Sequence, residues 1–167
     1  MNERVGTVNI MRSLIILFSY HHKNTEKIAT AMAKILEAEI RKPSEVDPAS
    51  LKDYDLVGWG SGVYSAQHHP SMISLAKKLP GSPGKKAFLF TTTGAPRIAY
   101  NDEFVKKNHQ KLRDVLEAKG YEIVGEFSCR GWNTNSFLKY FGGLNKGLPN
   151  TENIVKAEAF AKRLKEK

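Results

Sequence analysis

The sequence contains a single cysteine, Cys129, so it can form neither an intramolecular disulfide nor a cysteine-rich zinc site. It also lacks long apolar runs, because residues 14–18 are far fewer than the ~20 that span a membrane. Residues 1–12 lack the apolar segment of a secretory signal and are expected to form a short flexible leader. We therefore expect a cytoplasmic protein with no membrane partner, in which residues 13–167 form a single domain.

Acidic residues are few compared with basic ones. The chain has 17 Asp and Glu against 26 Lys and Arg, which gives a formal net charge of +9 at pH 7. Such a balance favours acidic partners when molecules first meet. The basic residues are spread along the chain without a zinc-finger or RNA-recognition motif, so we expect a solvated basic surface and no nucleic-acid partner.

Short apolar runs alternate with helical patterns along the chain. Each run is of the kind that forms a strand buried on both faces, as in a parallel sheet. The sequence therefore predicts an α/β fold with a doubly wound parallel sheet and helices on both faces. The expected strands lie in residues 13–19, 38–43, 55–64, 85–96 and 121–129.

Helix boundaries can be read from capping residues. Asn24 or Thr25 is expected to cap the first helix, where a side-chain oxygen accepts from a free N–H. Pro70 predicts the start of a second helix, because its fixed φ suits the first helical position. Asn101 predicts the cap of a long amphipathic helix, and Gly120 its end.

Four loops at the carboxyl ends of the expected strands carry polar and aromatic residues. They read SYHHKNT, GSGVYSAQHHPS, TTTGAPRIAYN and CRGWNTNS. Ligands of such sheets bind at this edge, where the strand order reverses. The first loop, with Ser19, Lys23 and a helix start, suits a phosphate, although ordinary capping of a structural helix explains the same residues.

Two histidine pairs, His21 with His22 and His68 with His69, raise the possibility of a metal site. Adjacent residues of a strand project to opposite sides, and no carboxylate is spaced to complete a site. We therefore expect anion contact or loop surface for these histidines, and no bound metal. Cys129 is expected to be a small buried residue at a strand end and not a nucleophile.

Two aromatic residues, Tyr64 and Trp132, fall on these loops. Each taken singly is most simply a packing residue. Two of them beside a phosphate-type turn instead suggest that a flat ligand ring is held between aromatic faces. Each such aromatic pair contributes about 1 kcal/mol in addition to the burial of its surface.

Taken as a set, the segments FSYHHKNTEKIA, YDLVGWGSGVY, FLFTTTG and GEFSCRGWNT resemble the flavodoxin family, and the resemblance spans residues 13–164. It implies a five-stranded sheet of order 2-1-3-4-5, noncovalently held FMN and electron transfer. The chain resembles a basic subgroup with an unusual phosphate loop. Typical members are acidic and carry a Thr-Gly pair before Asn-Thr, where this chain has His22 and Lys23.

The resemblance also implies which residues hold the cofactor. The phosphate would be surrounded by Ser19, His21, His22, Lys23, Asn24 and Thr25. The isoalloxazine ring would be flanked by Ser61, Gly62, Val63, Tyr64, Thr92, Thr93 and Gly94, with Trp132 as a third wall.

Three functions remain open at this point. The first is a small FMN-binding electron carrier whose redox partner has an acidic docking face. The second is an FMN-dependent oxidoreductase that reduces quinones or other small acceptors with NAD(P)H, since Arg97, Arg130 and Lys139 could hold a nucleotide phosphate. The third is a flavin-free binding module on the same fold.

Overall fold

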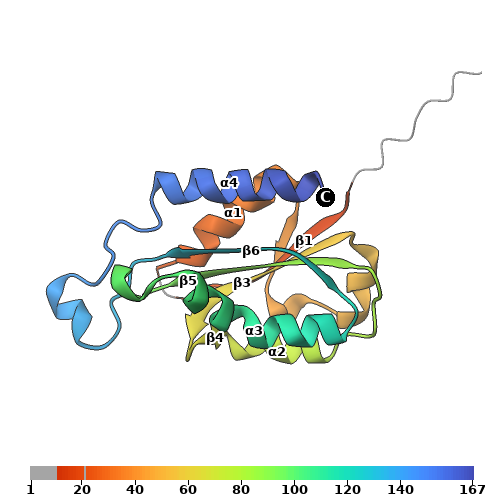
Figure 1. The fold of residues 1–167 in the computed structure, drawn as a ribbon, viewed down its shortest axis with the longest axis horizontal. Coiled ribbons are helices and arrows are strands. Elements are labelled where there is room, and N and C mark those ends of the chain that lie inside the picture. Colours follow the sequence, from red (N-terminus) through yellow and green to blue (C-terminus); the bar gives the residue numbers. More distant parts are fainter. Residues whose placement is uncertain (1–10, 21) are drawn as a thin grey trace, which may run out of the picture.

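Five parallel strands form the central sheet of the structure, a computed structural model that describes residues 11–20 and 22–167 (Figure 1). Along the sheet the strands follow the order β2-β1-β3-β5-β6, so the predicted order is confirmed, with β5 and β6 as its fourth and fifth strands. The predicted strands are β1 (Ser13–Phe18), β2 (Glu39–Arg41), β3 (Leu56–Tyr64), β5 (Lys86–Thr93) and β6 (Glu122–Arg130). The sequence did not predict β4 (Gln67–His68), which pairs antiparallel with the end of β3.

Helices cover both faces of the sheet, which confirms the doubly wound arrangement. Figure 1 shows α1 (Asn24–Leu36) and α4 (Thr151–Lys165) on one side, and α2 (Pro70–Lys77) and α3 (Asp102–Ala118) on the other. Four short 3₁₀ helices lie in the connections: η1 (Pro43–Glu45), η2 (Pro48–Asp53), η3 (Arg97–Ala99) and η4 (Ser136–Phe141).

The predicted starts of α2 and α3 are confirmed. Pro70 is the first residue of α2. The Asn101 side chain accepts from the N–H of Phe104 at 2.8 Å and so caps α3. Gly120 follows that helix with a φ of 89°, a left-handed value that glycine adopts without a Cβ penalty.

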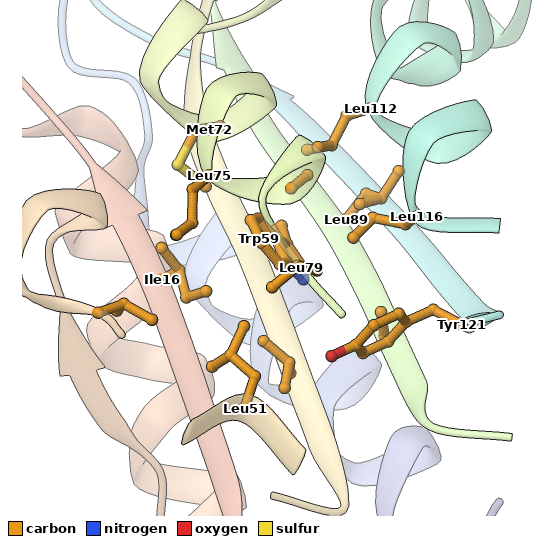
Figure 2. Close-up of a cluster of buried hydrophobic side chains, with 14 of the residues drawn as sticks. Ile16, Leu51, Trp59, Met72, Leu75, Leu79, Leu89, Leu112, Leu116 and Tyr121 are labelled. Carbon is orange, nitrogen blue, oxygen red and sulfur yellow. The ribbon is translucent and has the colours of Figure 1, made fainter. Parts of the chain in front are cut away.

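The two faces of the sheet bury separate apolar clusters, because side chains alternate along each strand. On β1, Leu14 and Ile16 point toward α2 and α3, whereas Ile15 points toward α1 and α4. Figure 2 shows the first cluster, in which Trp59 of β3 lies among side chains of the neighbouring strands and helices. Trp59 has no exposed surface, so this face of the sheet is a packed core.

Two glycines of β3 allow large rings on the neighbouring strand. A Cβ on Gly58 would overlap the ring of Phe88, and one on Gly60 would overlap the ring of Phe90. Both rings are fully buried in the cluster under α1 and α4. These glycines of β3 therefore serve packing of the core.

Some expectations lie outside the described residues. Residues 1–10 of the predicted leader and His21 are among them. In the described part of the chain, no helix has both the length and the apolar character needed to span a membrane. Residues 11–20 and 22–167 also contain no group of three or more His, Cys, Asp or Glu arranged to hold a metal.

Candidate functional site

A cleft of about 550 Å³ lies at the edge of the sheet where the parallel strands end. Its walls come from the loops that follow β1, β3, β5 and β6, as expected for this sheet order. The volume falls within the range of small-molecule sites, roughly 300 to 1,000 Å³. The predicted site residues that line this cleft are Ser19, His22, Asn24, Thr25, Gly62, Val63, Tyr64, Thr92, Thr93, Gly94 and Trp132.

Two predicted residues of the described chain do not line the cleft. Ser61 is completely buried, and its hydroxyl donates to the carbonyl of Gly62 at 2.8 Å and accepts from the N–H of His69 at 3.1 Å. The side chain of Lys23 is 73% exposed, and its ammonium lies 3.6 Å from the carboxylate of Glu26. Ser61 therefore supports the loop from beneath, and Lys23 belongs to the outer surface.

The turn before α1 differs from the one that the sequence predicts. His22 and Lys23 both have left-handed φ values, 51° and 52°, and Lys23 is the N-cap residue. The prediction that Asn24 or Thr25 caps α1 was wrong, because both lie inside the helix. Lys23 takes the N-cap position because its carbonyl accepts the first helical hydrogen bond, from the N–H of Lys27 at 3.1 Å, which brings Asn24 into the first turn.

The N-cap residue of α1, Lys23, makes no side-chain cap hydrogen bond. In contrast, α2, α3 and α4 each begin with a side chain that accepts from an N–H of the first turn: His69, Asn101 and Asn150. Among residues 11–20 and 22–167, the one side-chain acceptor at the first turn of α1 is the Ser19 hydroxyl, which accepts from the N–H of Glu26 at 3.3 Å. The start of α1 therefore presents unsatisfied donors and the positive end of the helix dipole at the cleft.

Polar side chains connect α1 to β5 and to the loop after β6. The hydroxyls of Thr25 and Thr92 lie 2.8 Å apart, and both residues are buried. The Asn24 amide donates to the carbonyl of Trp132 at 2.8 Å. A Cβ on Gly131 would come within 2.6 Å of that amide, so glycine is required for this approach.

The two predicted aromatic residues, Tyr64 and Trp132, contribute to the cleft walls. Tyr64 contacts Phe18 edge-on, with 6.1 Å between centroids, and its burial raises the pKa of its hydroxyl. Trp132 donates from its indole N–H to the carbonyl of Gly142 at 3.1 Å. His22 stacks on the Trp132 ring at 4.0 Å, which places a face of an imidazole against this wall.

The long connection after β6 is anchored, although the sequence indicates only an irregular segment. Asn133 and Leu144 exchange two backbone hydrogen bonds, of 2.9 and 2.7 Å. The Asn145 amide donates to the carbonyl of Ala95 at 3.0 Å and accepts from Arg130 at 3.0 Å. The cleft residues that sequence reasoning missed are Tyr20, Ala95, Asn133, Thr134 and Asn135.

The cations invoked for a nucleotide phosphate lie away from the cleft. Arg97 and Arg130 line a separate cavity of about 500 Å³ beside the start of α4. Lys139 lies on η4, where its ammonium is 5.0 Å from the centre of the Tyr140 ring. Thus these three residues do not form part of the cleft.

His68, His69 and Cys129 pack within the fold. His68 is fully buried, and its Nδ1 lies 3.1 Å from the Ser61 hydroxyl. His69 stacks on Phe18 with 3.5 Å between ring centres. Cys129 is 4% exposed, and burial raises its pKa to about 12, which confirms the prediction of a small buried residue.

A polar cluster around the buried His109, on the α3 side of the sheet, was not predicted. The imidazole of His109 lies 2.9 Å from the Thr91 hydroxyl through Nε2 and 2.9 Å from Glu126 through Nδ1. Arg113 donates twice to the same carboxylate, at 2.6 and 2.7 Å. Burial alone would raise the pKa of Glu126, but hydrogen bonds from His109 and Arg113 outweigh it and lower that pKa to about 2.

Known proteins related to this chain are consistent with the fold and the position of the cleft. The sequence profile of the family described as "Flavodoxin domain" matches residues 15–164. The chain belongs to the flavodoxin family. An uncharacterized protein of Methanocaldococcus jannaschii is 46% identical to this flavodoxin-family chain over 155 residues, which cover 92% of this chain and 98% of that protein.

Solved flavodoxins share the fold of this chain. Oxidised flavodoxin 2 of Bacillus cereus has a TM-score of 0.68 at 19% identity, with 93% of this chain and 98% of that chain covered. The flavodoxin of Streptococcus pneumoniae TIGR4 has a TM-score of 0.66 at 20% identity, covering 92% and 98%. The Fusobacterium nucleatum flavodoxin, solved with bound flavin mononucleotide, has a TM-score of 0.63 at 13% identity, covering 93% and 98%.

Proposed function

We propose that this flavodoxin-family chain binds FMN noncovalently in the cleft and acts as a small electron carrier. The observation that supports this most strongly is the start of α1, which lacks a side-chain cap from its N-cap residue and lies at a cleft that also contains Tyr64 and Trp132. When bound, FMN supplies the one- and two-electron chemistry, and the chain binds and orients it.

The phosphate end of FMN would lie at the start of α1. Free N–H groups and the helix dipole favour an anion there, and Ser19 and Thr25 add hydroxyls. If Thr92 donates its proton to Thr25, the Thr25 hydroxyl can donate its own proton into the cleft. These N–H and hydroxyl donors fit a phosphate, which they can bind directly without a bridging metal ion.

The flavin ring would lie along the loops after β3, β5 and β6. Gly62 and Gly94 let the backbone approach a flat ring closely, and Tyr64 and Trp132 offer aromatic surface. A Cβ on Gly94 would overlap the Asn133 side chain, so glycine there also lets the β6 loop close on the cleft.

An electron carrier is favoured over an FMN-dependent NAD(P)H:quinone oxidoreductase by the position of the cations. Arg97, Arg130 and Lys139 lie outside the cleft, and the Arg130 guanidinium donates to Asn145. We therefore expect the FMN-loaded protein alone not to oxidise NADPH at a steady rate when a quinone is present. Steady oxidation would favour the enzyme instead.

Titration with FMN tests the proposal directly. The chain, purified and freed of any bound flavin, is mixed with FMN, and quenching of flavin fluorescence gives a dissociation constant. Riboflavin, which lacks the phosphate, is the matched ligand and should bind at least 10-fold more weakly, since it loses charge-assisted hydrogen bonds worth about 1.5 to 3 kcal/mol each. If FMN fluorescence is not quenched, the proposal is wrong and the flavin-free binding module becomes the favoured function.

The net charge of +9 suggests the chemistry of the redox partner. Opposite charges steer two proteins together and raise the rate of their encounter. We accordingly propose a partner with an acidic docking face. Electron exchange with such a partner should slow as ionic strength rises, because salt screens exposed charges beyond about 10 Å at 0.1 M.

A further inference from the structure

Three large aromatic side chains are exposed together on η4. Phe137 is 66% exposed, Tyr140 77% and Phe141 81%. Figure 1 shows this light-blue segment projecting beyond the end of the sheet. Clustered exposed apolar groups mark interaction sites, whereas single ones are ordinary. We call Phe137, Lys139, Tyr140 and Phe141 the aromatic knob.

The aromatic knob is joined to the wall of the cleft. The residues directly before it, Asn133, Thr134 and Asn135, line the cleft. Behind it, the hydrogen bonds between Asn133 and Leu144 close the loop into a hairpin-like base. A protein that binds the aromatic knob would therefore come to rest beside the cleft.

The loops at this end of the molecule contain no acidic residue. Neither Asp nor Glu occurs in residues 17–25, 61–69, 91–101 or 127–151. The nearest acidic residues at two of these loops, Glu26 and Glu152, are each paired with a lysine. The same loops carry the cations Lys23, Arg97, Arg130, Lys139 and Lys146.

We propose that the aromatic knob is the docking surface for an acidic redox protein. Aromatic residues are enriched in the cores of protein interfaces, and the cations around them would steer a negatively charged partner. The proposal rests on the proposed electron-carrier function, in which one electron leaves the reduced flavin and reduces the oxidised partner. A protein partner is favoured over a lipid surface because the knob adjoins the cleft, and a partner held there has its redox group near the flavin.

The test compares two variants of the full chain. The triple variant Phe137→Ser, Tyr140→Ser, Phe141→Ser removes the knob's rings, and the control Ile40→Ser, Val155→Ser removes exposed apolar side chains on β2 and α4. FMN affinity is measured first for each protein. The photoreduced, FMN-loaded proteins are then mixed rapidly with oxidised cytochrome b5, an acidic protein, and separately with ferricyanide, which needs no docking surface.

The expected result is a loss specific to the triple variant. Its second-order rate with cytochrome b5 at low ionic strength should fall at least 10-fold, while its FMN affinity and its rate with ferricyanide stay within 2-fold of the unchanged chain. The control variant should keep both rates. The rate of the unchanged chain with cytochrome b5 should also fall as salt is added.

Several outcomes would overturn the proposal. Equal rates with cytochrome b5 for the unchanged and triple-variant proteins would remove the docking role while leaving FMN binding intact. Equal rates combined with knob-dependent sedimentation on phosphatidylserine vesicles would assign the surface to lipid. A dimer that the triple variant converts to monomers would assign it to a second copy. Failure of the unchanged chain to bind FMN would be seen in the first titration and would defeat the electron-carrier function itself.

Discussion

Two neighbouring threonines of β5 belong to two very different polar regions. Thr91 faces α3, where its hydroxyl contacts His109 at 2.9 Å and Ser128 at 3.0 Å. Thr92 faces α1, where its hydroxyl contacts Thr25 at 2.8 Å beside the cleft. Both threonines are almost completely buried. Residue type and burial alone therefore do not distinguish a structural hydroxyl from one at a binding site.

The difference lies in what surrounds each hydroxyl. The cluster around Thr91 is closed in its hydrogen bonding, because His109, Glu126 and Arg113 use one another as partners, although Glu126 and Arg113 also border a surface cavity. The region around Thr92 opens on the start of α1, whose N-cap residue contributes no side-chain hydrogen bond. A closed cluster stabilises the fold, whereas an open set of donors can bind a ligand. Variants on the two sides should consequently affect stability and FMN binding differently.

The largest effect is expected at the centre of the closed cluster. Glu126→Ala leaves His109 and Arg113 without their shared carboxylate, and the Glu126 side chain is only 23% exposed. Removing one partner of such a pair should lower the free energy of unfolding by about 3 kcal/mol. Urea denaturation measures this, with Glu122→Ala, an exposed carboxylate of the same strand, as the control. A loss below 1 kcal/mol would show that the cluster contributes little.

The pH dependence of stability should report the same carboxylate. The pKa of Glu126 is about 2 in the folded chain, against an ordinary value of 4.5. A lowered pKa means that its contribution is complete above pH 4.5 and is lost as the pH falls toward 2. Denaturation midpoints between pH 2 and 5 should therefore fall more steeply for the unchanged chain than for Glu126→Ala. Parallel slopes would contradict the assignment.

The sequence predicted the fold well because each strand is a short apolar run with a turn after it. It also predicted most of the cleft, since hydroxyl and glycine residues follow the strands at the edge where ligands bind. It failed where structure depends on distant contacts. Asn133 lines the cleft because it pairs with Leu144, and the partly buried Glu126 is an ion-pair residue because His109 and Arg113 face it. In a sequence, polar residues of this kind cannot be distinguished from ordinary surface residues, because their partners are far away along the chain.

A matched pair of substitutions separates the two polar regions. Thr91→Val removes a partner of His109 and should lower the free energy of unfolding by about 1 to 3 kcal/mol without changing FMN affinity. Thr25→Val also leaves a buried partner, Thr92, but it should weaken FMN binding about 10-fold, because a hydrogen bond to a charged group is lost. Fluorescence titration and urea denaturation measure the two effects. If both variants bind FMN with equal affinity, the phosphate does not contact Thr25 at the start of α1.

The smallest effect is expected at Lys23, which the resemblance to flavodoxins implies is a phosphate contact. In the structure its side chain is 73% exposed and pairs with Glu26, so it should act on a phosphate only through screened, long-range attraction. Lys23→Glu and Lys27→Glu, an exposed residue on the same helix, should therefore weaken FMN binding to a similar extent, about 2-fold. Both effects should vanish in 0.5 M salt. A 10-fold loss confined to Lys23→Glu would mean that the ammonium leaves Glu26 to contact the phosphate when FMN binds.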